Sequence, residues 1–181
     1  KSESSSLIDD DSSDNIDIPK KTGEFDWDVA MENFYINNIK IEVPLSMNLL
    51  GKDFVNDGEP FFNKSGNYLS FNMAHKDYDG LWLCNLKFKG ITEAEYNDDC
   101  IVSAIDYIGK PNIQGIKKDS SMELVYETWG EPDKIADKVI ESDKDIALYY
   151  GNEDGQIIYV MYDNKTNVVE TMYIDFENMK D

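Results

Sequence analysis

The sequence has no arginine and a single histidine, and it is poor in basic residues of any kind. All 17 basic residues are lysines, and 37 aspartates and glutamates outnumber them, so the formal net charge is −20. A nucleic-acid-binding surface must neutralise phosphates, and arginine is the usual reader of base edges. A strongly negative surface repels DNA, RNA and anionic lipid headgroups. The composition therefore excludes a nucleic-acid-binding function.

Residues for metal-dependent or nucleophilic catalysis are equally scarce. His75 is the lone histidine, and the sequence contains no Cys-x-x-Cys, His-Glu-x-x-His, Gly-x-Ser-x-Gly or glycine-rich phosphate loop. The acidic turns at 77–80 and 152–155 fail the EF-hand pattern, because Leu86 and Met161 stand where a glutamate ligand is required. Weak calcium binding at these turns stays open. We predict no catalytic residue, no metal site and no cofactor.

Cysteines and long apolar runs are also limited. Cys84 and Cys100 are the only cysteines, and we interpret them as small, partly buried hydrophobic residues. A disulfide between them is the alternative. No apolar run reaches about 18 residues, so no transmembrane segment is predicted.

The first residues of the sequence are too polar to form a core. Residues 1–14 are mostly serine and aspartate, and we predict that residues 1–30 form a disordered tether. This composition is typical of the segment after a removed signal peptide or a lipid-modified cysteine, and a simple mobile terminus is the alternative. The tether predicts an extracellular protein held at the bacterial cell surface, with room for a lipid anchor upstream of residue 1.

The rest of the sequence is organised by an internal repeat with a spacing of about 75 residues. We therefore divide the chain into a first unit, 31–109, and a second unit, 110–181. Five pairs of short segments correspond in the same order: 46–50 with 121–125, 58–60 with 130–132, 69–73 with 146–150, 79–80 with 154–155, and 101–102 with 168–169.

The second unit reads as a helix followed by strands. Ser120 and Glu123 predict a capping box, and Gly130 with Pro132 predicts the helix end. The apolar side chains of this helix share one face. Strands are predicted at 146–151, 156–162 and 168–176, with a two-residue turn at 154–155 between the first two. Residues 133–145 are either a second short helix or an extended arm. The face of the helix comprises Met122, Val125, Tyr126 and Trp129.

The first unit repeats this pattern more weakly. A short helical stretch follows Pro44, and an extra strand at 33–43 leads into it. Strands are predicted at 68–74, 81–89 and 100–108. The predicted fold class is α+β, with two tandem units, each a short helix packed on an antiparallel β-meander.

Tyrosines on the strands and the acidic turn of the first unit are the candidate binding residues. Tyrosine suits β-strands for structural reasons alone, but it is also enriched in protein-recognition surfaces. In strand 156–162 both faces are apolar, so the sheet is either covered twice or binds a partner. The candidate partner-binding residues are Lys76, Asp77, Tyr78, Asp79, Tyr149, Tyr159, Tyr162 and Tyr173.

Two known families resemble this arrangement. The helix end at 120–133, which contains Trp-Gly-Glu-Pro-Asp and is followed by Tyr149-Tyr150, resembles that of small bacterial outer-membrane assembly lipoproteins. The tandem helix-and-sheet units across 31–181 resemble the fold of the beta-lactamase-inhibitory protein. The resemblance implies a concave sheet and binding rather than catalysis. No inhibitory residue carries over, because no local motif matches. The absence of arginine and the two cysteines interpreted as free also differ from a typical disulfide-stapled inhibitor.

These observations predict a non-enzymatic, surface-tethered module that binds a protein or cell-envelope partner through its sheet face and hairpin tips. A secreted inhibitor that plugs an enzyme cleft with the acidic, aromatic turn at 76–79 is the first alternative. A carboxylate-based hydrolase is the second, although no pair of acidic residues stands out in the sequence.

Overall fold

A computed structural model describes residues 23–77, 82–140 and 143–177. Within these ranges the chain forms three short helices and two antiparallel sheets, which confirms the predicted α+β class. None of the described helices is long and apolar enough to cross a membrane. The helices are α1 (Trp27–Glu32), α2 (Met47–Leu50) and α3 (Met122–Trp129).

The larger sheet has nine described strands in the order β10-β11-β12-β13-β7-β6-β5-β3, and β4 also pairs with β5. All pairs of neighbouring strands are antiparallel. The strands are β3 (Phe54–Asn56), β4 (Phe61–Asn63), β5 (Tyr68–His75), β6 (Trp82–Lys89), β7 (Ala104–Ile108), β10 (Lys134–Ile140), β11 (Asp143–Gly151), β12 (Ile157–Asp163) and β13 (Val168–Asp175).

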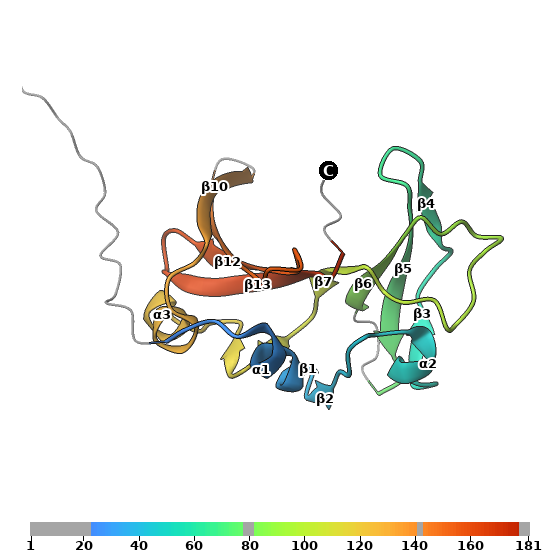
Figure 1. Ribbon diagram of the computed structural model, residues 1–181, viewed down its shortest axis with the longest axis horizontal. Coiled ribbons are helices and arrows are strands. Elements are labelled where there is room, and N and C mark those ends of the chain that lie inside the picture. Colours follow the sequence, from blue (N-terminus) through green and yellow to red (C-terminus); the bar gives the residue numbers. More distant parts are fainter. Residues whose placement is uncertain (1–22, 78–81, 141–142, 178–181) are drawn as a thin grey trace, which may run out of the picture.

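The large sheet is bent into a trough (Figure 1). Strands β12, β13 and β7 form its floor, and β10 at one end and β4 with β5 at the other form its walls. Helices α1 and α3 lie beneath the floor, together with a small sheet in the order β2-β1-β8-β9, and α2 lies beneath β3 and β5. The helices and the small sheet therefore cover one face of the large sheet, and no described helix covers the other. The small sheet comprises β1 (Phe34–Ile36), β2 (Ile39–Lys40), β8 (Pro111–Ile113) and β9 (Ile116–Lys117).

The strand order is similar on the two sides of the β13–β7 pair. From this pair outward, β12, β11 and β10 follow on one side, and β6, β5 and β3 on the other. Two isolated bridges occupy corresponding positions, Ser46 with Ile101 and Ser121 with Val168. These observations favour the division into units 31–109 and 110–181, which stays a prediction.

Helix α3 begins one residue later than predicted. Its N-cap is Ser121, whose side chain accepts a hydrogen bond from the Leu124 N–H, while the hydroxyl of Ser120 accepts one from the Lys117 N–H. The capping box predicted at Ser120 is therefore wrong, because this hydroxyl closes the preceding turn. The predicted apolar face is confirmed, since Met122, Val125, Tyr126 and Trp129 are all buried.

The structure changes two further predictions, one for a strand and one for a turn, and decides between two alternatives for residues 133–145. The strand predicted at 33–43 is a hairpin, because Asn37 and Asn38 both have positive φ and reverse the chain between β1 and β2. The turn at 154–155 is part of a longer loop. Gly155 has a positive φ but Asp154 does not, and the Asn152 side chain accepts a hydrogen bond from the Asp154 N–H. Of the two alternatives for 133–145, the described residues 134–140 form the extended strand β10.

The folded region begins before residue 31. Phe25 packs edge-on against Trp129 with ring centroids 5.5 Å apart, and Ala30 in α1 is fully buried. The predicted tether over 1–30 is therefore too long at its C-terminal end, because its last apolar residues join the core. Residues 1–22 lie outside the described residues.

Both cysteines are free thiols, as the favoured interpretation predicted. Cys84 is buried on β6, and burial raises the pKa of its thiol to about 12. A thiol with such a pKa stays protonated and is a poor nucleophile. Cys84 therefore acts as a small core residue.

Two buried tyrosines on the covered face allow a direct test of hydrogen bonding in the core. The Tyr150 hydroxyl donates to the Gly130 carbonyl oxygen at 3.0 Å, whereas no described residue pairs with the Tyr162 hydroxyl. We expect Tyr150→Phe to lower the free energy of unfolding by about 1–3 kcal/mol and Tyr162→Phe to leave it unchanged or raise it. Urea unfolding measures both variants. An equal loss in the two would show that the Tyr162 hydroxyl is hydrogen-bonded in solution.

Candidate functional site

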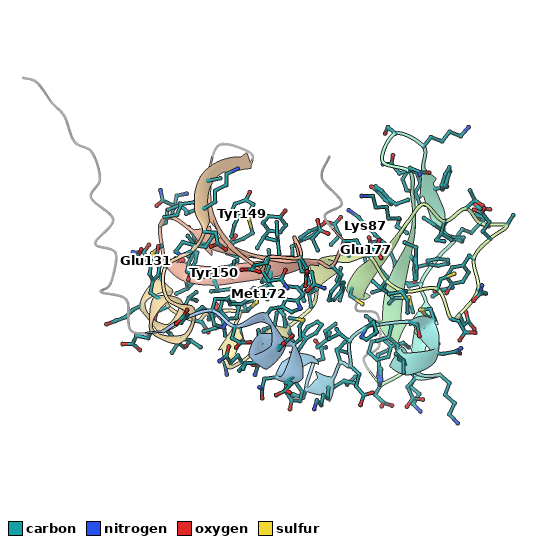
Figure 2. All side chains as sticks on the ribbon, in the orientation of Figure 1. Lys87, Glu131, Tyr149, Tyr150, Met172 and Glu177 are labelled. Carbon is teal, nitrogen blue, oxygen red and sulfur yellow. The ribbon has the colours of Figure 1, made fainter. Side chains whose placement is uncertain are left out.

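The two faces of the large sheet carry different side chains. On β11, Tyr150 points to the covered face and is 1% exposed, while its neighbour Tyr149 points into the trough and is half-buried. Figure 2 shows Tyr149 and Lys87 on the trough side, and Tyr150 and Met172 on the helix side. We call the open side, which carries Tyr149, the trough face. No described helix covers it (Figure 1).

Three tyrosines form a row across the trough floor, and we call Tyr149, Tyr159 and Tyr173 the tyrosine row. They are direct cross-strand partners, since Tyr149 lies opposite Tyr159 and Tyr159 lies opposite Tyr173. The first two rings are edge-to-face, with centroids 4.4 Å apart and an interplanar angle of 89°. The Tyr159 and Tyr173 centroids are 5.0 Å apart at 48°. Such cross-strand aromatic contacts stabilise both the sheet and one another.

A lysine lies at each end of the row. The Lys134 ammonium is 5.4 Å from the centroid of the Tyr149 ring. The Lys87 ammonium is 5.8 Å from the Tyr173 centroid and 4.9 Å from the Tyr68 centroid. Both lysines lie within cation–π range of their tyrosines. Lys87 thus connects the row to β5, in the other half of the sheet.

Lys87 is held in place by a carboxylate on the neighbouring strand. Its Nζ lies 2.8 Å from an Asp106 Oδ, and the Lys87 side chain is only 14% exposed, against 48% for Asp106. The Lys87 ammonium is held by Asp106 and by the two tyrosine rings named above. It neutralises the carboxylate of Asp106. The centre of the trough therefore carries no net charge from this pair, although the chain is strongly acidic.

Two members of the tyrosine row, Tyr159 and Tyr173, remain uncharged at neutral pH. Burial raises the pKa of Tyr159, and the nearby Asp175 carboxyl raises it further. Burial also raises the pKa of Tyr173, to which Asp106 and then Asp175 add. Because a negative charge on either phenol would be poorly solvated, both stay protonated. Tyr159 and Tyr173 therefore contribute neutral phenol groups to the row.

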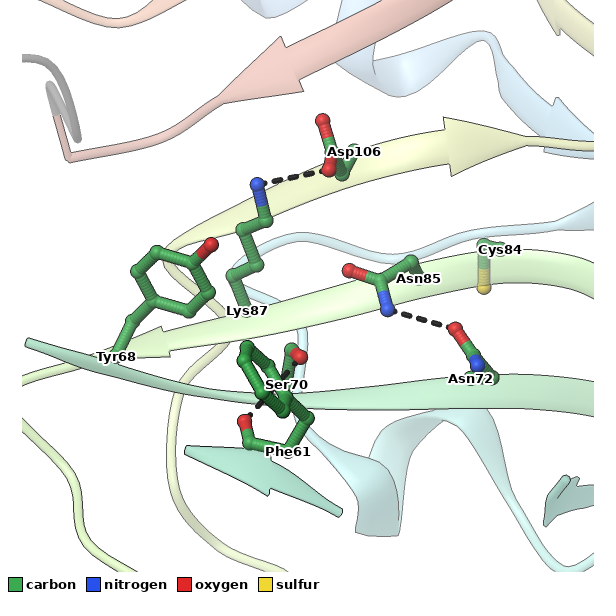
Figure 3. A pocket seen from close by; sticks show the side chains of 8 residues that line it. All are labelled: Phe61, Tyr68, Ser70, Asn72, Cys84, Asn85, Lys87 and Asp106. Carbon is green, nitrogen blue, oxygen red and sulfur yellow. Dashed lines mark hydrogen bonds and ion pairs between the residues drawn. The ribbon is translucent and has the colours of Figure 1, made fainter. Parts of the chain in front are cut away.

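A pocket of about 470 Å³ opens beside Lys87 (Figure 3). We call it the trough pocket. Two asparagines on neighbouring strands lie side by side in it, where the Asn85 Nδ2 donates to the Asn72 Oδ1 at 2.8 Å. On its β4 side, the Ser70 hydroxyl donates to the Phe61 carbonyl oxygen, and the Phe61 side chain is 61% exposed. The lining residues are Phe61, Tyr68, Ser70, Asn72, Cys84, Asn85, Lys87 and Asp106.

A second hollow, of about 800 Å³, lies beside the start of α3. The first amides of α3 are already engaged: the Leu124 N–H donates to Ser121, and the Met122 N–H donates to the Asn167 carbonyl oxygen. Its lining also includes asparagine and serine side chains, among them the buried Asn37 and the half-buried Asn112. Because no aromatic residue lines this hollow, we place the candidate site on the trough face, which carries the tyrosine row. The lysines that line this second hollow are Lys110, Lys117 and Lys118.

The structure separates the tyrosines predicted from the sequence. Tyr149, Tyr159 and Tyr173 share the trough face. Tyr162 is fully buried on the covered face, so its prediction as a binding residue is wrong. A β-bulge shifts the register of β12 against β13 between residues 161 and 162. Tyr162 packs in the core because it lies three residues from Tyr159, on the opposite face of β12.

The acidic turn is only partly described. Lys76 forms an ion pair with Asp53, which follows α2, and Asp77 is exposed beside His75. Tyr78 and Asp79 lie outside the described residues. Neither Lys76 nor Asp77 lines the trough pocket or contributes to the tyrosine row. The described residues predicted as one set of binding candidates therefore lie in two separate places.

Sequence reasoning missed the pocket half of the site. Lys87, Asn85 and Phe61 were not among the candidates, although one signal was available. Residues 84–89 alternate strictly between apolar and polar side chains, which predicts one buried and one open face. The open face of β6 could have been found from this pattern, but its neighbours on β4, β5 and β7 could not.

The described residues include no group of three histidine, cysteine, aspartate or glutamate side chains that could hold a metal ion. Comparison of the chain with protein-family models, with curated proteins and with solved structures gives no match. The candidate site therefore has to be interpreted from its own geometry.

Proposed function

We propose that the protein is a non-enzymatic binding module whose trough face binds a polypeptide partner carrying basic side chains. The observation that carries this proposal is the tyrosine row, three rings in register on the face that no described helix covers. Tyrosine is enriched at the centres of protein interfaces, because it contributes a large contact area and a hydroxyl group at little entropic cost. The Ser/Asp-rich leader supports a location outside the cell, where the module would be tethered to the surface.

Charge indicates which polypeptides the trough would attract. The chain carries a net charge of −20, so its field draws basic partners and repels acidic ones. The exposed carboxylate of Asp106 lies next to the row, where it can accept hydrogen bonds from lysine or arginine. Lysine and arginine can also stack on tyrosine rings. A basic segment therefore suits both the long-range field and the local chemistry.

The orientation of the rings favours a polypeptide over a polysaccharide. Sugar rings stack on flat aromatic faces that are open to solvent. In the tyrosine row, the Tyr149 and Tyr159 rings are perpendicular, and Tyr159 is only 5% exposed. One ring therefore meets the other edge-on, and the Lys134 ammonium lies over the Tyr149 ring. The half-buried Tyr149 and Tyr173 are the members of the row that side-chain and backbone groups of a polypeptide can reach.

The test is selection of a phage-displayed library of random linear peptides on the folded chain. We expect enrichment of peptides rich in lysine and arginine, whose binding weakens as salt concentration rises. Tyr149→Ala and Tyr173→Ala should each weaken binding of a selected peptide by about tenfold or more, as expected for interface anchors. Isothermal calorimetry measures the affinities.

The matched control is Tyr35→Ala, a half-buried tyrosine on β1 in the small sheet beneath the floor. It should bind selected peptides like the parent chain. Equal losses in the Tyr35 and Tyr149 variants would contradict the proposal, as would enrichment of acidic peptides. Binding to a polysaccharide panel without any peptide enrichment would replace the polypeptide with a glycan partner.

A further inference from the structure

Phe61 gives the trough pocket an apolar wall that is open to solvent. It lies on β4, at the end wall of the trough, and 61% of its side chain is exposed. Tyr68, its neighbour in the lining, is fixed by the Lys87 ammonium over its ring and by the Asn63 Nδ2, which donates to its hydroxyl. The pocket therefore has one fixed aromatic wall and one exposed ring. Covering the Phe61 ring with another apolar group would be favourable.

The side-by-side asparagines give the pocket one donor and one acceptor. Their mutual hydrogen bond uses one Asn85 amide hydrogen and the Asn72 oxygen. The Asn72 Nδ2 and the Asn85 Oδ1 remain for a ligand, and no other described side chain is hydrogen-bonded to either atom. Both side chains are half-buried and line the pocket. A ligand that displaced water here would have to satisfy both atoms, since each unsatisfied group costs about 1–3 kcal/mol.

Few ligand groups can satisfy both atoms at once. A carboxylate only accepts hydrogen bonds, and an ammonium or guanidinium group only donates them, whereas a hydroxyl does both. The charges beside the pocket do not change this preference, because Lys87 and Asp106 neutralise each other at 2.8 Å. A hydroxyl on an aromatic ring meets both requirements, since its ring can pack on Phe61 while its oxygen reaches the asparagines. This combination is the side chain of tyrosine.

The pocket is continuous with the tyrosine row, because Lys87 contacts both Tyr173 and Tyr68. We infer that the trough pocket receives a tyrosine side chain of the polypeptide partner, with its ring against Phe61 and its hydroxyl between Asn72 and Asn85. This inference rests on the proposed function, and it names an anchor residue that the tyrosine row alone does not predict.

The test uses N-acetyl-tyrosinamide as a probe in place of the unidentified partner. We expect saturable shifts of the side-chain amide NMR signals of Asn72 and Asn85, with a dissociation constant of about 1 mM or below. N-acetyl-phenylalaninamide, which lacks the hydroxyl, should bind about tenfold more weakly, because both asparagine atoms would stay unsatisfied. Phe61→Ala should weaken binding of the tyrosine probe by about tenfold as well. Because Phe61 is exposed, we expect the Phe61→Ala variant to stay folded, and its melting curve checks this.

Val55→Ala is the matched control, because Val55 is 47% exposed on β3 of the same sheet and does not line the pocket. It should bind the probe like the parent chain. Shifts that do not saturate, equal binding of the two probes, or unchanged binding by Phe61→Ala would each overturn the inference.

A further variant separates this inference from the proposed function. Tyr149→Ala should keep probe binding and lose binding of the selected peptides, since Tyr149 does not line the pocket. If the probe fails while peptides still depend on Tyr149, the pocket inference falls and the proposed function stands. If the probe binds but no peptide does, the proposed function fails, and the inferred role for a partner's tyrosine fails with it.

Discussion

Replacing Trp129 by alanine is expected to lower the free energy of unfolding by about 3–5 kcal/mol. The Trp129 side chain is 1% exposed, and its ring packs edge-on against Phe25 and Tyr150, with centroids 5.5 and 5.2 Å away. Its Nε1 donates to the Gln114 Oε1 at 2.9 Å. A helix as short as α3 is marginal without such packing. The loss is a large share of the 5–15 kcal/mol that typically stabilises a domain.

The form of the transition tests the organisation of the core. Buried residues of both predicted units belong to one continuous cluster, which includes Leu69 and Phe88 from one unit and Trp129 and Val160 from the other. We therefore expect Trp129→Ala to shift a single unfolding transition, followed by circular dichroism in urea. Leu124→Ala on the same helix is the control, because Leu124 is 40% exposed and should cost less than about 1 kcal/mol. Two separated transitions, with one unmoved, would show that the units unfold independently.

Placing a carboxylate at Ile105 is expected to cost even more than the loss of Trp129. Ile105 lies on β7 at the centre of the sheet, opposite Ile174 on one side and Leu86 on the other. All three side chains are fully buried. Ile105→Asp would bury a charge without a partner, or a carboxyl group that must take up a proton, among apolar groups. We expect a loss of about 4 kcal/mol or more, which few single substitutions reach.

Ile105→Val is the matched control, since it keeps an apolar, β-branched side chain and should cost about 0.5–1.5 kcal/mol. Hydrogen exchange of the aspartate variant reports which strands lose protection. Because β7 pairs with β13 through few residues, we expect loss of protection on both sides of this junction. Protection that persists in β11 and β12 would contradict the view of one cooperative core.

Local patterns were enough to predict several elements of the fold. The spacing of Met122, Val125 and Trp129 predicted the buried face of α3, because helical periodicity determines which side chains share a side. The same reasoning separated Tyr159 from Tyr162 on β12, since their separation of three residues places them on opposite faces. Both faces of that strand are apolar, however, so the pattern could not show which face was covered.

The candidate binding residues were harder to predict than the elements that carry them. Lys76 and Asp77 drew attention because of their acidic turn, yet they line neither the row nor the pocket. Lys87 looked like an ordinary strand lysine. Its significance comes from Asp106 on β7, Tyr68 on β5 and Tyr173 on β13, which only strand pairing brings within its reach.

The sequence by itself determined the acidic charge, the α+β class, the face of α3 and the absence of the motifs for metal and nucleophilic chemistry. These properties depend on composition and on side chains within a few residues of one another. Only the tertiary structure decided which sheet face is open and which residues meet on it. The reason is physical: Tyr149, Tyr173 and Lys87 are brought together by cross-strand register and by the pairing of β13 with β7. Register and strand order depend on contacts between residues far apart in the chain, which no local pattern records.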